Sequence, residues 1–148
     1  MNVGIIGLGV GEKHLETYLS HDDVDKITIC DFDEKTLHKI HLKYPDLFIC
    51  EDSSKVLTDP SIDLVSICSY DHFHADQIVM ALQNKKHVFV EKPICLSEEE
   101  LSRIRTAFSN STDLKLSSNF ILRKEPRFIE LMHKISSGEL GDIYYAEG

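Results

Sequence analysis

The sequence lacks the features of a membrane protein and of a secreted precursor. No apolar run approaches the roughly 20 residues that a membrane span needs, and the opening Met1-Asn2-Val3 lacks the basic segment that begins a signal peptide. Basic side chains are also few, with 16 Lys and Arg against 25 Asp and Glu and a net charge of −9. This negative net charge repels the phosphate backbone of nucleic acids. The sequence therefore predicts a cytoplasmic protein that binds neither membrane nor nucleic acid.

Closely spaced cysteines and other metal-ligand patterns are absent too. The four cysteines, Cys30, Cys50, Cys68 and Cys95, form no C-x-x-C pair. We expect them to be reduced and to act as small buried apolar residues. His72 and His74 stand two positions apart, but no third ligand follows at a suitable offset, so no metal site is predicted.

What the sequence does contain is ordinary globular composition, with 42% hydrophobic and 28% charged residues in a chain of 148. Short β-branched runs alternate with longer amphipathic segments, which is typical of βαβ units around a parallel sheet. We predict strands at 2–6, 26–30, 47–50, 64–68, 87–90 and 115–119, and helices at 12–20, 34–43, 53–58, 74–83 and 97–109. Ser97 is the expected N-cap of the last helix, with three glutamates in its first turn. The expected fold class is α/β, a doubly wound parallel sheet with helices on both faces.

The C-terminal segment does not belong to this alternation. A further helix is expected at 125–136, and Asp142 to Glu147 reads as a strand without a partner in the parallel core. We interpret the chain as a dinucleotide-binding domain at 1–120 followed by the start of a second domain at 121–148, whose remainder is missing. An exposed apolar surface is then expected around Phe120, Ile121, Ile143 and Tyr145.

Glycines follow the first predicted strand without a gap, in the run Gly7-Leu8-Gly9-Val10-Gly11. A tight turn of this kind lets a phosphate approach the backbone N–H groups at the start of a helix. Position 12 is Glu, so the loop is one residue shorter than G-x-G-x-x-G, which puts in doubt whether Gly11 packs the helix on the sheet. We predict that these five residues bind the cofactor. The alternative is a turn that needs glycine only for its backbone shape.

An acidic residue follows the second predicted strand. Asp31 lies 20 residues beyond Gly11, where an acid hydrogen-bonds the adenosine ribose of a dinucleotide. No arginine stands nearby to accept a 2′-phosphate, so NAD is favoured over NADP. Helix capping is the alternative role for Asp31, although Asp33 is also placed to cap.

The loop after the fourth predicted strand contributes Ser69, Tyr70 and His74, which we expect to line the nicotinamide side of the cofactor site. Beyond the next strand comes Glu91-Lys92-Pro93. In an open parallel sheet, ligands bind outside the carboxyl ends of the strands. Lys92 is the predicted catalytic residue, because its ammonium can stabilise charge on the reacting oxygen during hydride transfer. Glu91 either pairs with Lys92 or holds the loop.

Taken together, these motifs resemble the Gfo/Idh/MocA family of oxidoreductases. The resemblance rests on residues 5–11, His74, the stretch 87–93 and, downstream, Asn119 to Arg123 and Gly138 to Ile143, and it covers nearly the whole chain. Ser69 matches a frequent Thr of the family, and Lys92 matches the lysine of its Glu-Lys-Pro motif. Tyr70 stands where the family usually has Pro.

The resemblance implies a Rossmann domain that binds NAD(P) and an enzyme that oxidises or reduces sugars, cyclitols and related polyols. In such proteins a second domain carries most substrate contacts, an acid–base residue and the oligomer interface. We therefore expect a homo-oligomer for the full-length protein and an inactive fragment here. Two alternatives stay open: a non-catalytic NAD-binding or sensing module, and a methyltransferase using S-adenosylmethionine.

Overall fold

A computed structural model of the chain describes residues 1–147. Six strands form one parallel sheet with the order β3-β2-β1-β4-β5-β6. The strands are β1 (Asn2–Ile6), β2 (Lys26–Cys30), β3 (Phe48–Cys50), β4 (Leu64–Ile67), β5 (His87–Val90) and β6 (Leu116–Ser118). The helices are α1 (Leu8–Leu19), α2 (Glu34–Lys43), α3 (Ser53–Thr58), α4 (Asp71–Gln83), α5 (Glu98–Ser109), the 3₁₀ turn η1 (Ile121–Lys124) and α6 (Pro126–Ser136). The predicted doubly wound α/β fold is confirmed.

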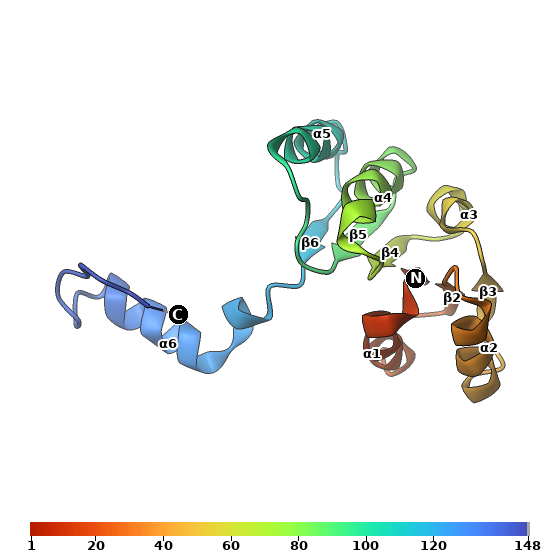
Figure 1. The fold of residues 1–148 in the computed structure, drawn as a ribbon, viewed down its shortest axis with the longest axis horizontal. Coiled ribbons are helices and arrows are strands. Elements are labelled where there is room, and N and C mark those ends of the chain that lie inside the picture. The colour runs from red at the N-terminus through yellow and green to blue at the C-terminus, as the bar shows by residue number, and fades with distance from the viewer. Residues whose placement is uncertain (148) are drawn as a thin grey trace.

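Helices cover both faces of the sheet. Figure 1 shows α1 and α2 on one side of the strands and α3, α4 and α5 on the other. The strands are therefore apolar on both faces, as buried parallel strands are: in β1, Val3 and Ile5 pack toward α1 and α2, whereas Ile6 packs toward α3 and α4. This arrangement explains why the predicted strands appear in the sequence as short continuous apolar runs.

Short polar side chains cap the N-termini of three connecting helices, α2, α3 and α5. Ser97 caps α5 by accepting a hydrogen bond from the Glu100 N–H at 3.1 Å, which confirms the predicted N-cap. Asp33 and Asp52 cap α2 and α3 in the same way. Asp33 and Asp52 stand three and two residues after the preceding strands, so α2 and α3 begin close to the carboxyl edge of the sheet.

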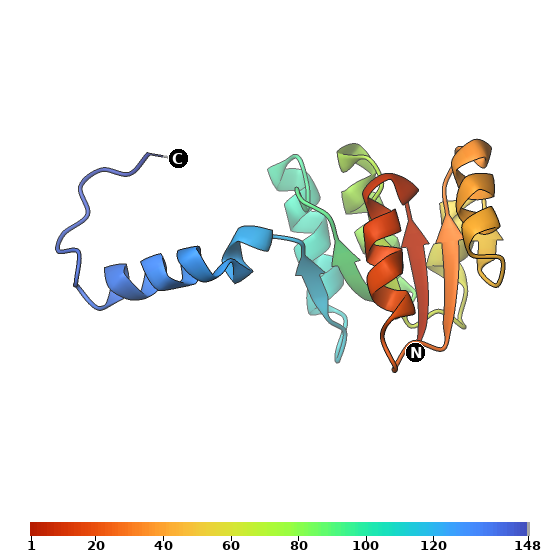
Figure 2. The same ribbon diagram turned by 90° about the horizontal axis from the view of Figure 1, so that it is seen from below.

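The segment after β6 lies apart from the sheet (Figures 1 and 2). Pro126 occupies the first turn of α6 and suits it, because this position needs no N–H. The predicted strand at Asp142 to Glu147 is wrong, since these residues carry no regular structure. A short run of β-branched and aromatic residues favours a strand, but a strand also needs a neighbouring backbone to bond, and none pairs with it in residues 1–147.

Apolar side chains are exposed along this segment, as predicted. Phe120, Ile121, Ile143 and Tyr145 have 44%, 68%, 50% and 70% of their surface accessible. The division into domains at residue 120 stays a prediction. No helix in the described part of the chain is long and apolar enough to cross a membrane.

Candidate functional site

A crevice of about 730 Å³ lies at the carboxyl ends of β1, β2 and β4. The strand order reverses between β1 and β4, and crevices at such switch points are where doubly wound sheets bind ligands. Six of the predicted cofactor residues line it: Gly7, Gly9, Val10, Asp31, Ser69 and Tyr70. Sequence reasoning missed other lining residues, namely Phe32, Thr36, Glu51, Ser53, Phe73 and Gln77.

The glycine turn is tighter than predicted, because α1 begins at Leu8 and not at Glu12. Gly7 is the N-cap residue and has a φ of 88°, which L side chains rarely adopt. A Cβ at Gly7 would lie 2.5 Å from the carbonyl oxygen of Cys68, whereas a Cβ at Gly9 would meet nothing within 4 Å. Gly7 is therefore required by the fold, and Gly9 leaves open space above the first turn of α1.

Gly11 packs α1 closely on the sheet, so the doubt raised by the short loop was wrong. A Cβ at Gly11 would lie 3.1 Å from Cγ2 of Ile5 and 3.4 Å from Cβ of Cys68. The earlier helix start brings Gly11 to this contact. Leu8 is buried, and its side chain does not line the crevice, whereas Val10 is half-exposed and does.

Asp31 has the alternative role that the sequence left open, helix capping, but it caps α1 and not α2, which Asp33 caps; its ribose-binding role stays a prediction. Its Oδ2 accepts a hydrogen bond from the Leu8 N–H at 2.7 Å, and its Oδ1 accepts one from the Asp33 N–H at 3.0 Å. The first of these satisfies an N–H at the start of α1 that has no partner within the helix. Asp31 thus caps α1 from the next strand and still lines the crevice, where each oxygen retains further capacity to accept.

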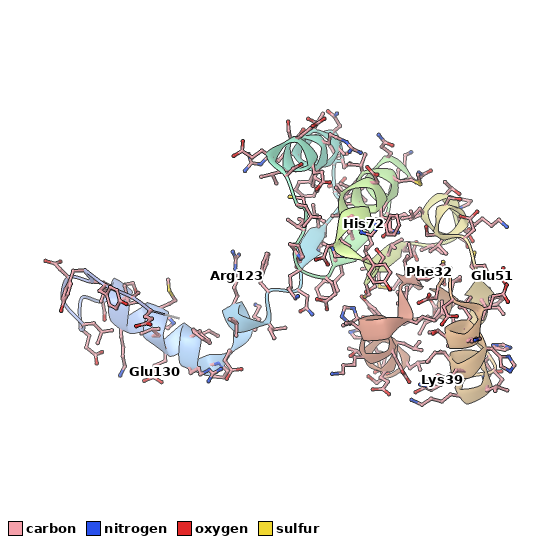
Figure 3. The ribbon with its side chains drawn as sticks, in the orientation of Figure 1. Phe32, Lys39, Glu51, His72, Arg123 and Glu130 are labelled. Carbon is pink, nitrogen blue, oxygen red and sulfur yellow. The ribbon has the colours of Figure 1, made fainter. Side chains whose placement is uncertain are left out.

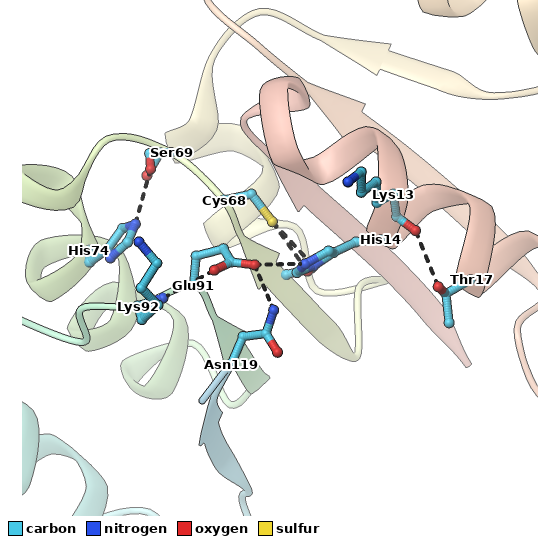
Figure 4. Close-up of polar contacts among 10 residues, drawn as sticks. Lys13, His14, Thr17, Cys68, Ser69, His74, Glu91, Lys92 and Asn119 are labelled. Atoms are coloured by element: carbon cyan, nitrogen blue, oxygen red, sulfur yellow. Dashed lines mark hydrogen bonds and ion pairs between the residues drawn. The ribbon is translucent and has the colours of Figure 1, made fainter. Parts of the chain in front are cut away.

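A second polar group lies at the ends of β4, β5 and β6 (Figure 4). Glu91 Oε1 accepts hydrogen bonds from Asn119 Nδ2 at 2.7 Å and from His14 Nε2 at 3.0 Å. The His14 and Glu91 side chains are only 11% and 13% exposed. Burial alone would raise the pKa of Glu91, but the bonds from Asn119, the Lys92 N–H and His14 outweigh it and lower the pKa below 4.5.

His14 extends this group to β4. Its Nδ1 lies 2.8 Å from Ser66 Oγ and 3.3 Å from Cys68 Sγ. Burial raises the pKa of Cys68 to about 12, so this thiol stays protonated at neutral pH and is unreactive. The sequence analysis did not predict a role for His14. Its position three residues after Gly11 puts it on the helix face that packs against the sheet, and this spacing could have indicated its contact with the strand ends.

Lys92, the predicted catalytic residue, is exposed at the end of β5. Its backbone N–H donates to Glu91 Oε2 at 3.3 Å, and within residues 1–147 no ion pair joins the two side chains. Glu91 therefore holds the loop, which resolves the alternative left open by the sequence. Lys92 does not line the crevice itself.

His74 connects two loops and does not line the crevice. It is fully buried in the first turn of α4, which starts three residues earlier than predicted. Its Nδ1 lies 2.6 Å from the Pro93 carbonyl and its Nε2 3.0 Å from the Ser69 carbonyl. His74 thus ties the loop after β4 to the loop that carries Lys92, and any effect on a ligand is exerted through these loops.

Cys30 and Cys68 are buried, as predicted, whereas Cys50 and Cys95 are only partly buried. Residues 1–147 contain no group of three side chains that could hold a metal ion. A sheet of this order, with a glycine turn at a helix start and a carboxylate after the second strand, defines a dinucleotide-binding domain. The chain belongs to the GFO_IDH_MocA family, the oxidoreductase family with an NAD-binding Rossmann fold, whose model matches residues 1–120. This membership confirms the resemblance and does not support the methyltransferase alternative.

Several known proteins similar to the chain are named as dehydrogenases. It is 30% identical over 142 residues to myo-inositol 2-dehydrogenase of Thermotoga maritima, with 95% of the chain and 42% of the relative covered. It is 29% identical over 146 residues to D-glucoside 3-dehydrogenase of Escherichia coli, with 97% and 41% covered. The crystal structure of scyllo-inositol dehydrogenase from Lactobacillus casei with bound NAD(H) and scyllo-inositol matches with a TM-score of 0.86 at 27% identity, covering 97% of the chain and 43% of that structure. The chain thus spans about two fifths of the length of these relatives.

Proposed function

We propose that the chain binds NAD(H) in the crevice and serves as the cofactor domain of an oxidoreductase acting on a sugar, cyclitol or related polyol. The observation that carries this proposal is the Gly7–Gly9 turn at the start of α1, held beside Asp31 at the switch point of the sheet. The open space above Gly9 fits a group that comes close to the backbone. Bound NAD supplies the hydride acceptor, and NADH the donor, for a hydroxyl-bearing carbon.

The chain's own residues divide the binding between them. Backbone N–H groups in the first turn of α1 hold the pyrophosphate, since this helix end favours anions. Asp31 accepts from the ribose hydroxyls and repels a 2′-phosphate, and no Lys or Arg is present among the described lining residues to offset that repulsion. Ser69, Tyr70 and the loop tied by His74 bound the site on the β4 side. NAD is therefore the expected cofactor, with NADP bound more weakly.

Lys92 is the proposed catalytic residue, with Glu91 and His14 holding its loop in place. Its ammonium would stabilise negative charge on the substrate oxygen as the hydride is transferred. The relatives named as inositol and glucoside dehydrogenases support a polyol substrate. Because the chain spans about two fifths of these relatives, we assign turnover to a longer protein with substrate contacts beyond residue 120. We further propose that this protein is a cytoplasmic homo-oligomer.

Calorimetric titration of the chain with NAD⁺ and NADP⁺ tests the proposal. The unmodified chain should bind NAD⁺ more tightly. Gly9→Ala should weaken NAD⁺ binding roughly tenfold or more, because a methyl group would obstruct charged hydrogen bonds worth about 1.5–3 kcal/mol each. The same change should not destabilise the fold, since Ala favours helix and meets no neighbour. An unmodified chain that binds neither dinucleotide would refute the proposed function.

A further inference from the structure

The side chain of His14 connects helix α1 to the loop that carries Lys92. Its Nε2 lies 3.0 Å from Glu91 Oε1, and the other oxygen of that carboxylate accepts a hydrogen bond from the Lys92 N–H at 3.3 Å. Figure 4 shows these contacts running from α1 to the end of β5. Two hydrogen bonds and one carboxylate therefore join α1 to the backbone of the proposed catalytic residue.

The His14 ring is held in one orientation by its other contacts. Nδ1 lies 2.8 Å from the hydroxyl oxygen of Ser66, a fully buried residue of β4, and the ring centroid lies 5.4 Å from that of Phe89 on β5. Ionised Glu91 offers only acceptors, so Nε2 carries the hydrogen of that bond, and the Ser66 hydroxyl can donate to Nδ1. Because both ring nitrogens have partners, the ring cannot turn without losing a hydrogen bond.

The same helix begins where the pyrophosphate of the proposed cofactor would bind. His14 follows Leu8, the first residue of α1, by six positions, which is about 9 Å along the helix axis. The helix also sits closely on the sheet, since a Cβ at Gly11 would lie only 3.1 Å from Cγ2 of Ile5. The helix start and the His14 donor thus belong to one packed element.

We propose that His14 is a positioning residue for the reaction, which acts through Glu91 to fix Lys92 relative to the bound cofactor. This inference rests on the proposed function and adds that the cofactor and the Lys92 ammonium take their positions from one helix. Asn119 also donates to Glu91, but it follows β6, and none of the described residues that line the crevice comes from β6. A misplacement of about 1 Å at a reacting centre can lower a rate about 10²-fold.

Steady-state kinetics of the whole protein test the role of His14. His14→Leu fills the space of the ring but removes the donor to Glu91, so it should lower kcat about ten- to a hundredfold, with little change in the KM for NAD⁺. His14→Gln should restore most of the turnover, because its amide N–H stands near the place of Nε2. His21, whose side chain is 61% exposed beyond the end of α1, gives the matched control His21→Leu, which should leave turnover unchanged.

A double-mutant cycle with Lys92→Met separates positioning from a merely structural role. If His14 acts through Lys92, His14→Leu should cause no further loss of kcat once Lys92 is replaced, since the group that it positions is absent. His14→Asn, whose shorter amide reaches Ser66 but not Glu91, gives the same test should His14→Leu fail to fold. Urea unfolding and NAD⁺ titration of the 148-residue variants check folding and cofactor binding.

Two results would overturn the positioning role of His14. One is a folded His14→Leu or His14→Asn variant that keeps the kcat of the unmodified protein, and the other is a loss that adds in full to that of Lys92→Met. Either result would leave the proposed function standing. A Lys92→Met protein with unchanged turnover would instead contradict the proposed role of Lys92, and an unmodified chain that binds no NAD⁺ would refute the proposed function itself.

Discussion

The two ends of the carboxyl edge of the sheet use their side chains in opposite ways. On the side of β4 to β6, His14, Glu91 and Asn119 are bonded to one another and mostly withdrawn from solvent. On the side of β2, Phe32 and Tyr70 are exposed, with their ring centroids 6.1 Å apart. One end is therefore stabilised within the chain, and the other presents surface that gains contacts only when a ligand binds. Changes at the first end should alter stability or chemistry, and changes at the second should alter affinity.

The largest expected effect comes from Lys92 at the internally bonded end. In the whole protein, Lys92→Met should lower turnover about 10²–10³-fold, because one positioned donor to the reacting oxygen is lost. Affinity for NAD⁺ should change little, since the proposed pyrophosphate and ribose contacts are made elsewhere. Steady-state kinetics and a binding titration measure the two quantities separately.

Lys39→Met is the matched control for this change, because Lys39 is an exposed lysine on α2 (Figure 3). It should leave turnover and affinity unaltered. If Lys92→Met kept the turnover of the unmodified protein, Lys92 would be a turn residue without a catalytic role.

Removing Glu91 should cost more stability than removing an exposed acid from the other end. Glu91→Ala leaves His14 and Asn119 without their acceptor, and breaking a largely buried pair of this kind lowers the free energy of unfolding by about 3 kcal/mol. Glu51→Ala, at an exposed position lining the crevice, should change it by less than about 0.5 kcal/mol. Urea unfolding of both variants measures the difference, and similar losses at the two positions would contradict the comparison.

The two ends also differ in how well the sequence predicts them. Gly7 and Asp31 follow strands directly and Tyr70 is the third residue after β4, so their place at the crevice can be inferred from local spacing. His14 and Glu91 are separated by 77 positions, and their pairing depends on how α1 packs against β4 and β5. The same limit explains the wrong strand at 142–147, whose local pattern suits a strand but which has no neighbouring backbone to pair with among the described residues.

At the ligand-facing end, Asp31→Ala should narrow the preference for NAD⁺ over NADP⁺. The change removes both a charged hydrogen bond to the ribose and the repulsion of a 2′-phosphate, together worth about 1–3 kcal/mol. Titration of each variant with both dinucleotides gives the ratio. Equal affinities in the unmodified chain would show that Asp31 does not select the cofactor.

The smallest effect concerns acid stability at the internally bonded end. Because the folded-state pKa of Glu91 is lowered, its ionised form stabilises the fold above pH 4.5, and this contribution is lost as the pH falls through the lower folded-state value. The stability difference between the unmodified chain and Glu91→Gln should therefore shrink below pH 4.5. Unfolding curves across this range measure it, and a difference that does not vary with pH would count against the network.

The hydrogen bond from the Leu8 N–H to Asp31 has a consequence for how cofactor preference can change during evolution or engineering. The carboxylate that would discriminate between two dinucleotides also completes the start of α1, so a mutation that admits a phosphate also leaves a helix end unsatisfied. A single substitution at position 31 would thus lower the discrimination against NADP and at the same time destabilise the start of α1. A productive switch to NADP would require a compensating acceptor for the Leu8 N–H, and the proposed preference for NAD would then be hard to lose by stepwise change.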